Sequence, residues 1–299
     1  MPSAPFSPAQ LAAVFPALSG FQFKAAGSYK SVYYVKQANG TDEVLKIVRL
    51  PIPRSTEEEQ ATYEQELGRV QREVAILAVC ASPFVVKLGA LPPHAVVIDG
   101  TPCFAYTEEL LNGSDLASVI SLGAGGPPTE AEIKTLLRCL VSAIQVLWRD
   151  HRVVHRDIKP GNIFSTRDAN RPYVLIDLGI AYDVSVPGLT VRKTDFPHTP
   201  LYMAPEMIKA DFRETMSYRS DLYAAGLSTY EFAAGVHPLA RSGDTDVKTY
   251  IRVIQQEPAP LGKYRPEISD VLRKLVDQLL KKNPALRPAN MALILSQIN

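Results

Sequence analysis

The sequence predicts a bilobal α+β fold in which a small strand-rich lobe precedes a larger, mainly helical lobe. Short runs of β-branched and aromatic residues dominate residues 20–110. Through residues 111–299, apolar residues instead recur at helical spacing. With 299 residues and 46% hydrophobic content, the chain is long enough to fill a sizeable core.

Residues 1–19 are predicted to form an N-terminal extension with one short helix. Ser7 is the expected N-cap, Pro8 occupies the first helical position, and Gln10 is placed to bond back to the cap. We therefore expect this helix to begin at Pro8.

Strands are expected to make up most of the first lobe. The pairs Asn39-Gly40 and Asp99-Gly100 favour hairpin turns between them. We expect the strands over residues 21–23, 31–35, 44–48 and 95–98.

One helix interrupts these strands. Residues 55–58 resemble a capping box, and Val70, Val74 and Leu77 then recur at helical spacing. The sequence therefore predicts a single main helix in the small lobe.

The second lobe is expected to begin after a linker near residues 108–113. Thr129 and Glu132 form a predicted capping box, and the broad apolar stripe that follows extends to Trp148. A strand is predicted over residues 173–176. Further helical patterns occupy residues 219–235, 245–257 and 268–281.

The composition argues against several classes of partner and location. With 32 basic and 31 acidic side chains, nothing in the bulk charge indicates binding to nucleic acid or to an anionic membrane. The three cysteines form no CxxC pair, which fits a reducing cytoplasm rather than a disulfide framework or zinc site. Since no run of about 18 apolar residues exists and the first basic residue is Lys24, we expect neither membrane spanning nor export.

The densest group of polar motifs begins at residues 155–162, where the sequence is HRDIKPGN. This run resembles the catalytic loop of protein kinases. The resemblance implies that Asp157 accepts or orients the proton of the substrate hydroxyl and that Asn162 holds a magnesium ion. Residues 177–179 (DLG) resemble the metal-binding Asp-Phe-Gly element with leucine replacing phenylalanine, so Asp177 is expected to bind the metal.

ATP and Mg2+ are the cofactors that this resemblance implies. Phosphoryl transfer needs charge neutralisation and in-line positioning, and hard oxygen ligands suit magnesium. Lys46, at the end of a predicted strand, resembles the kinase lysine that binds the α- and β-phosphates. Glu73 is its usual partner on the helix, and we expect an ion pair between them that forms and breaks as the helix moves.

The loop that covers the nucleotide departs from the family pattern G-x-G-x-x-G-x-V. Residues 25–32 read AAGSYKSV, so that Gly27 is the one glycine of three that remains. We expect looser coverage of the phosphates, or use of the Lys30 ammonium instead. Val32 is expected to form the roof of the adenine site, and Val44 stands where kinases usually carry alanine under the adenine.

Residues 107–110 (TEEL) align with the hinge that binds the purine edge in kinases. The backbone groups of Glu108 and Leu110 are the expected hydrogen-bonding partners there. Thr107 is expected to be a small gatekeeper at the back of the pocket. The alternative is that Thr107 is simply a buried strand residue.

The resemblance continues downstream and covers roughly residues 20–297. Residues 198–206 (HTPLYMAPE) resemble the end of a kinase activation segment, and Asp221 belongs to the helix beneath it. In the family, an arginine equivalent to Arg287 pairs with the glutamate equivalent to Glu206, so we expect this contact to be structural.

The expected activity is phosphorylation of serine and threonine hydroxyls on protein substrates. Lys159 follows the pattern of serine/threonine-directed kinases, and the threonine that aligns with Thr199 contacts the catalytic aspartate and lysine in that family. One alternative is a pseudokinase scaffold that binds partners without phosphotransfer, suggested by the reduced glycine loop. Another is a small-molecule kinase of the aminoglycoside-phosphotransferase type. Kinases of that type generally lack a lysine equivalent to Lys159 and an activation segment that ends in Ala-Pro-Glu, and this sequence has both.

Regulation is expected to involve Arg156, since kinases with arginine at this position often use it to hold a phosphorylated activation loop. Counting back from Glu206, the usual phosphorylated position falls on or near Asp195, with Thr194 beside it. Either Asp195 supplies a permanent charge, or Thr194 is autophosphorylated; we favour Thr194, because phosphate brings more charge and three acceptor oxygens. Other acceptors in this segment are Ser185 and Thr190.

Overall fold

The computed structural model describes residues 6–27, 29–52, 56–123, 125–178, 182–183, 200–208 and 215–298. The chain divides into two compact units. The first runs to Val79 and includes Val86–Leu111, and the second comprises Cys80–Val85 and the chain from Asn112. The expected boundary between residues 110 and 111 lies one residue earlier, and the short excursion of residues 80–85 into the second unit was not predicted.

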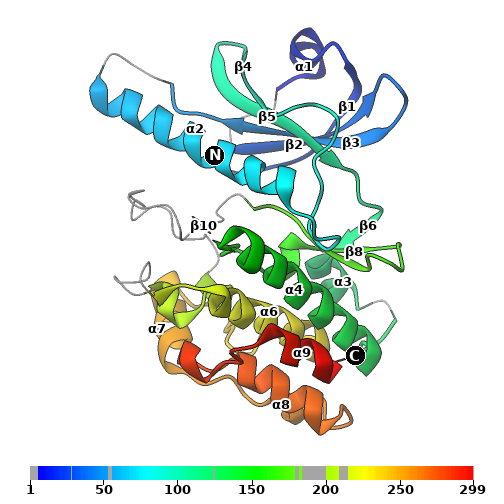
Figure 1. The fold of residues 1–299 in the computed structure, drawn as a ribbon, viewed down its shortest axis with the longest axis vertical. Coiled ribbons are helices and arrows are strands. Elements are labelled where there is room, and N and C mark those ends of the chain that lie inside the picture. Colours follow the sequence, from blue (N-terminus) through cyan, green and yellow to red (C-terminus); the bar gives the residue numbers. More distant parts are fainter. Residues whose placement is uncertain are drawn as a thin grey trace. The chain divides into compact units, whose positions relative to one another are not determined.

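The first unit is built on a five-stranded antiparallel sheet with the order β1-β2-β3-β5-β4 (Figure 1). Asp99 and Gly100 have φ angles of 48° and 73°, as the predicted two-residue hairpin turn requires. The sheet is more extensive than predicted. Its strands are β1 (Leu18–Ala26), β2 (Lys30–Gln37), β3 (Asp42–Arg49), β4 (His94–Ile98) and β5 (Thr101–Glu109).

The N-terminal helix α1 (Pro8–Val14) begins where the sequence predicts, with the Ser7–Gln10 capping box formed. Leu11 and Phe15 nevertheless belong to the buried core cluster that also contains Leu45 of β3. The predicted N-terminal extension with its short helix therefore packs onto the core of the first unit through Leu11 and Phe15.

Helix α2 (Glu57–Val79) lies along the sheet in Figure 1 and buries Val70, Val74 and Leu77, as its apolar spacing predicts. The Thr56 hydroxyl accepts the Glu59 N–H at 3.3 Å. The N-cap of α2 is therefore Thr56, one residue later than the start of the predicted capping box at residue 55.

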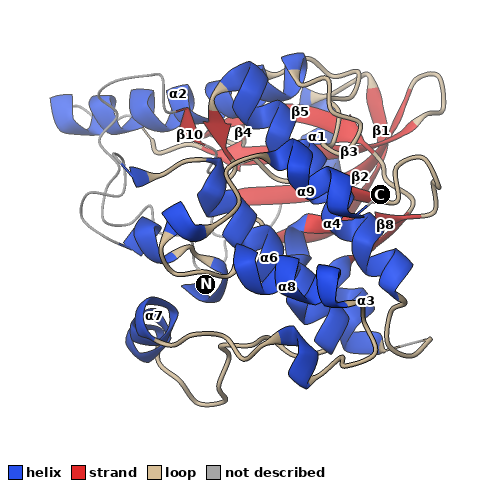
Figure 2. Cartoon of the chain, turned by 60° about the horizontal axis from the view of Figure 1, so that its bottom comes forward, coloured by secondary structure: helices blue, strands red, loops and turns tan. Residues whose placement is uncertain are grey.

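The second unit is mainly helical (Figure 2), and α6 packs against both α4 and α8. The Thr129–Glu132 capping box of α4 is formed as predicted. Two further helices, α3 and α9, were not predicted. The helices are α3 (Leu116–Leu122), α4 (Glu130–His151), α6 (Tyr218–Ala234), α7 (Asp246–Gln255), α8 (Asp270–Leu279) and α9 (Met291–Ile298).

Short strands and 3-10 helices place the polar loops of the second unit. One sheet has the order β6-β8-β9, and β7 pairs with β10. The strands are β6 (Gly113–Asp115), β7 (Val153–Val154), β8 (Ile163–Thr166), β9 (Tyr173–Leu175) and β10 (Tyr182–Asp183). The 3-10 helices are η1 (Pro160–Asn162), η3 (Pro200–Tyr202), η4 (Pro205–Ile208), η5 (Leu261–Lys263) and η6 (Pro284–Leu286).

The described helices include none that is both long and apolar enough to cross a membrane.

Gly226→Ala is expected to destabilise the second unit, although alanine is the better helix former. A Cβ at Gly226 would lie 2.8 Å from the Leu279 Cβ and 3.1 Å from the Leu280 Cδ2. Overpacking of this kind costs about 1–3 kcal/mol, which outweighs the propensity gain of about 1 kcal/mol. The measurement is the free energy of unfolding in urea.

Gly68→Ala in α2 is the matched control. The nearest atom to its new Cβ is the flexible end of Arg72, at 3.3 Å, so this substitution is expected to stabilise. A Gly226→Ala protein as stable as the parent would contradict the packing argument.

Candidate active site

The predicted catalytic loop forms a compact hydrogen-bonded cluster around Asp157. Lys159 Nζ donates to both carboxylate oxygens, at 2.9 and 2.8 Å. Asn162 Nδ2 donates to the Asp157 Oδ2 at 2.7 Å and to its carbonyl oxygen at 2.9 Å. The structure therefore brings together three residues that the sequence proposed as functional, and it fixes the orientation of the aspartate.

Asp221, near the start of α6, anchors the catalytic loop through two hydrogen bonds to its backbone. Its two carboxylate oxygens accept the backbone N–H groups of His155 at 2.7 Å and Arg156 at 3.0 Å. Burial raises the pKa of Asp221 to about 7, while the two N–H donors act in the opposite direction. The double contact holds Arg156 at a φ of 70°, which a non-glycine residue rarely adopts.

The two predicted metal-binding residues lie close in the second unit. The Ile176 N–H donates to the Asn162 carbonyl at 2.9 Å, which places Asp177 next to the catalytic loop. The charges of Asp157 and Asp177 both act to raise the pKa of the buried His155 imidazole, although burial lowers it by more. Both carboxylates therefore lie within electrostatic range of the same imidazole.

This arrangement fits magnesium. Because the Asn162 amide nitrogen makes both bonds to Asp157, the Asn162 Oδ1 is the side-chain atom left for a cation. The Asp177 carboxylate adds a second hard oxygen donor, and Mg2+ is usually held by one or two protein oxygens together with substrate phosphates and water. Asp177 has a φ of 65°, a strained conformation of the kind found at functional sites.

In the first unit, Lys46 is paired with a different carboxylate from the one expected. Its Nζ lies 2.8 Å from the Oε1 of Glu108, and both side chains are buried. Glu73 instead lies 3.7 Å from the Nζ of Lys30 and accepts the Tyr106 hydroxyl at 3.3 Å. The predicted pair between Lys46 and Glu73 is therefore not formed in this structure, and the part played by Tyr106 was missed.

The geometry of Thr107 does not fit a gatekeeper and corrects that expectation. The strand register pairs Thr107 with Leu45, which faces away from Lys46 because alternate side chains project from opposite faces. The Thr107 hydroxyl accepts the Leu91 N–H at 2.9 Å, as in a buried strand residue. The Glu108 side chain projects from the same face of the sheet as Lys46 and pairs with it. Glu108 therefore contributes its side chain to this face, whereas only its backbone was expected to be functional.

Val32, Val44 and Leu110 were expected around the adenine, and their positions in the first unit are compatible with that expectation. Val32 is directly paired with Lys46, and Val44 lies two residues before Lys46, so both share its face of the sheet. Leu110 lies just beyond the end of β5 and is exposed. Their contacts with a base, and those of Gly27, remain predictions.

The expected contact between Glu206 and Arg287 is formed and buried. The guanidinium binds the carboxylate through two bonds, Nη1 to Oε1 at 2.6 Å and Nη2 to Oε2 at 2.8 Å. The Ser220 hydroxyl also donates to the Glu206 Oε1, at 2.7 Å. This pair ties the end of the activation segment to α6 and to the segment after α8. The residues Ser185, Thr190, Thr194, Asp195 and Thr199 lie outside the described residues.

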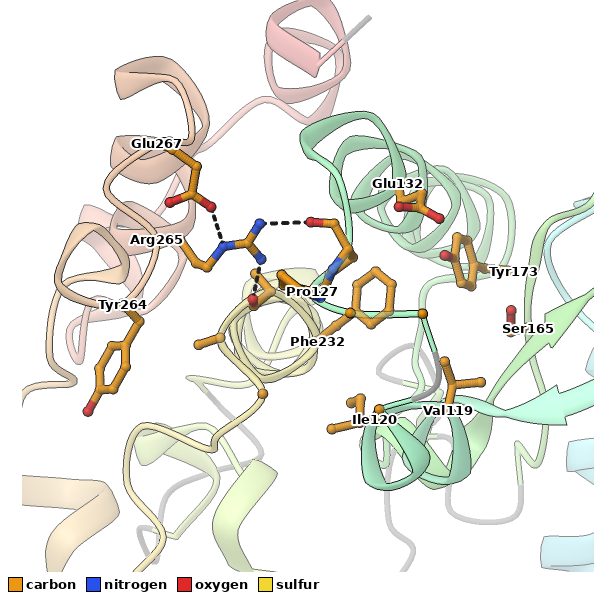
Figure 3. Close-up of a pocket in the computed structure, with 17 residues that line it drawn as sticks. Val119, Ile120, Pro127, Glu132, Ser165, Tyr173, Phe232, Tyr264, Arg265 and Glu267 are labelled. Carbon is orange, nitrogen blue, oxygen red and sulfur yellow. Dashed lines mark hydrogen bonds and ion pairs between the residues drawn. The ribbon is translucent and has the colours of Figure 1, made fainter.

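A separate pocket of about 680 Å³ lies within the second unit, between α3, the start of α4 and the end of α6 (Figure 3). Arg265 crosses its wall, where it donates to the carbonyls of Pro128, at 2.8 Å, and Ala233, and pairs with Glu267 at 2.6 Å. The guanidinium is thus bound to the pocket's own wall. Within the part of the chain that the structure describes, none of the predicted catalytic residues lines this pocket.

The fold and the cluster around Asp157 define a protein kinase, and comparison with known families agrees. The family model for the protein kinase domain matches residues 26–297, so the chain belongs to the protein kinase family. The prediction of the family and of its α+β fold is confirmed.

Three relatives illustrate the range of the similarity. The chain is 32% identical to the serine/threonine-protein kinase pkn3 of Myxococcus xanthus, over 82% of this chain and 43% of that protein. It is 31% identical to the serine/threonine-protein kinase PkaA of Streptomyces coelicolor, over 78% of this chain and 39% of that protein. It is 27% identical to the protein kinase wis1 of Schizosaccharomyces pombe, over 88% of this chain and 40% of that protein. The chain therefore spans about two fifths of the length of these relatives.

Proposed function

We propose that this chain transfers the γ-phosphate of Mg·ATP to serine and threonine hydroxyls of protein substrates. The observation that carries the proposal is the contact of Lys159 with both carboxylate oxygens of Asp157. A lysine at this position suits a site for an alkyl hydroxyl, and the similar proteins pkn3 and PkaA are named serine/threonine kinases. Membership of the kinase family supports ATP as the phosphate donor.

In this proposal the residues of each unit have separate tasks. Asp157 orients the substrate hydroxyl and accepts its proton, while Lys159 steadies the carboxylate. Asn162 and Asp177 supply oxygen ligands to magnesium, which neutralises phosphate charge when bound. In the first unit, lysine ammonium groups bind phosphate oxygens.

The test is transfer of labelled γ-phosphate to a mixture of proteins, followed by identification of the phosphorylated amino acid. Labelled phosphoserine or phosphothreonine is the expected result. Labelled phosphotyrosine alone would contradict the substrate class. Mg·ATP binding without any transfer would support the scaffold alternative, and transfer only to a small molecule would support the other alternative.

Asp177→Ala is expected to remove the magnesium dependence of ATP binding, because it deletes the one carboxylate assigned to the metal. Titrations of ATP with and without Mg2+ measure this. Asp150→Ala, which removes an exposed aspartate paired with Arg149, is the control and should keep the parental dependence. An Asp177→Ala protein in which magnesium still strengthens ATP binding would show the assignment to be wrong.

Control of activity by Arg156 stays a proposal from the sequence. Loss of activity in Thr194→Ala, with phosphate detected on Thr194 of the parent, is expected if that residue is autophosphorylated. Activity should be compared before and after phosphatase treatment. If Thr194→Ala keeps its activity and Asp195→Ala loses it, Asp195 supplies a permanent charge instead. If neither substitution changes the activity, both mechanisms are wrong.

A further inference from the structure

Two lysines of the first unit project from one face of its sheet. Strand β2 pairs Val32 with Lys46, and strand β5 pairs Tyr106 with Lys46. Since side chains two residues apart project from the same face, Lys30 and Glu108 also belong to this face. Lys30 and Lys46 therefore lie on the same face of the sheet, where the family pattern leads one to expect a single phosphate-binding lysine.

The first of these lysines, Lys30, forms the ion pair with Glu73 that was expected for Lys46. Its Nζ lies 3.7 Å from the Glu73 Oε1, and the carboxylate is 4% exposed. A buried carboxylate is costly without a nearby cation, so this contact stabilises Glu73 in its place on α2. The Tyr106 hydroxyl, which donates to the same oxygen at 3.3 Å, fixes the carboxylate further.

The second lysine, Lys46, is balanced by Glu108 instead. These two side chains are 7% and 4% exposed and lie 2.8 Å apart, whereas the Lys30 side chain is 21% exposed. Lys30 is therefore the more accessible of the two ammonium groups. It also closes the loop that follows β1, because its carbonyl accepts the Gly27 N–H at 2.8 Å.

We propose that Lys30 is a phosphate-binding lysine of this kinase, oriented by Glu73, and that Glu108 restrains Lys46. This inference rests on the proposed function. Lys30 occupies the last glycine position of the loop pattern, and a glycine there could offer only its backbone N–H to the phosphates. An ammonium at that position compensates for the two missing glycines.

The experiment compares the binding of Mg·ADP with that of adenosine, which lacks phosphates. Lys30→Met is expected to weaken Mg·ADP binding by about tenfold or more, because a charged hydrogen bond is lost. Adenosine binding should change by less than about twofold, since the base contacts remain. Lys30→Arg, which keeps the cation, should recover most of the Mg·ADP affinity.

Lys36→Met is the matched control, since Lys36 lies on the same strand and pairs with Asp42 at 2.6 Å on the exposed surface. It should bind both ligands like the parent. The ratio of the two affinities does not depend on the fraction of folded protein, so any loss of stability in Lys30→Met leaves the comparison valid. Equal weakening of both ligands, or parental Mg·ADP binding, would overturn the role of Lys30.

A second substitution tests the restraint on Lys46. In the Lys30→Met protein, Glu108→Gln removes the carboxylate that holds Lys46, which is then free to approach Glu73 and the phosphates. Partial recovery of Mg·ADP affinity is expected, and no recovery would show that Glu108 does not restrain Lys46. A parent protein that transfers no phosphate would count against the proposed function, whereas an active parent with an unaffected Lys30→Met variant would count only against this inference.

Discussion

Asp157→Ala is expected to reduce phosphotransfer by at least about a hundredfold while leaving Mg·ATP binding largely intact. A positioned general base contributes about 10²–10⁴-fold to a rate, and Asp157 is the carboxylate that Lys159 and Asn162 hold in place. Because the metal is assigned to Asp177 and Asn162, the nucleotide should still bind. Steady-state turnover and a separate ATP titration measure the two effects.

Asp168→Ala is the control for this prediction, since Asp168 is an exposed loop aspartate of the same unit. It should keep parental turnover. Equal turnover in Asp157→Ala and the parent would refute the assignment of the base. A parallel loss of ATP affinity would instead show that Asp157 contributes to the nucleotide site.

Arg287→Ala is expected to cost about 3–5 kcal/mol of unfolding free energy, the usual penalty for removing one partner of a buried ion pair. It leaves the carboxylate of Glu206, a residue that is 2% exposed, without its guanidinium partner. It also frees three backbone carbonyls that accept from Arg287, those of Arg219, Lys281 and Lys282. Urea unfolding followed by circular dichroism measures the loss.

Arg149→Ala offers the matched comparison, because Arg149 pairs with Asp150 on the exposed surface. Its expected cost is about 0–1 kcal/mol. Arg287→Lys keeps the charge but not the two parallel bonds, so it should fall between the parent and Arg287→Ala. If Arg287→Ala and Arg149→Ala cost the same, the buried pair would have no special role in stability.

Features set by local chemistry were predicted well from the sequence. The capping boxes at Ser7 and Thr129 and the Asp99-Gly100 turn depend on residues within a few positions of one another. At the start of α2, a serine and a threonine stand side by side, and either can cap a helix, so the prediction was off by one residue.

Several features set by distant contacts were not predicted, although the pair of Glu206 and Arg287 was expected from the family resemblance. Which of Thr107 and Glu108 faces Lys46 depends on the register between β3 and β5, and a shift of one residue reverses the faces. The burial of Leu11 in α1 depends likewise on packing against β4, which is distant in sequence. The catalytic loop could be identified because its residues are contiguous in sequence. The cation beside Glu73 could not be identified in this way, because it depends on how the strands of the sheet are paired.

The ion pair between Glu108 and Lys46 has a consequence for inhibitor design. A ligand with an apolar group that extends along the Lys46 face of the sheet would reach Glu108. Here such a group would cover a carboxylate and an ammonium, and burying charges against an apolar surface is costly. A compound that presents a basic amine to the Glu108 carboxylate avoids this cost. Selective binding of a compound to this site should therefore come from charge rather than from size.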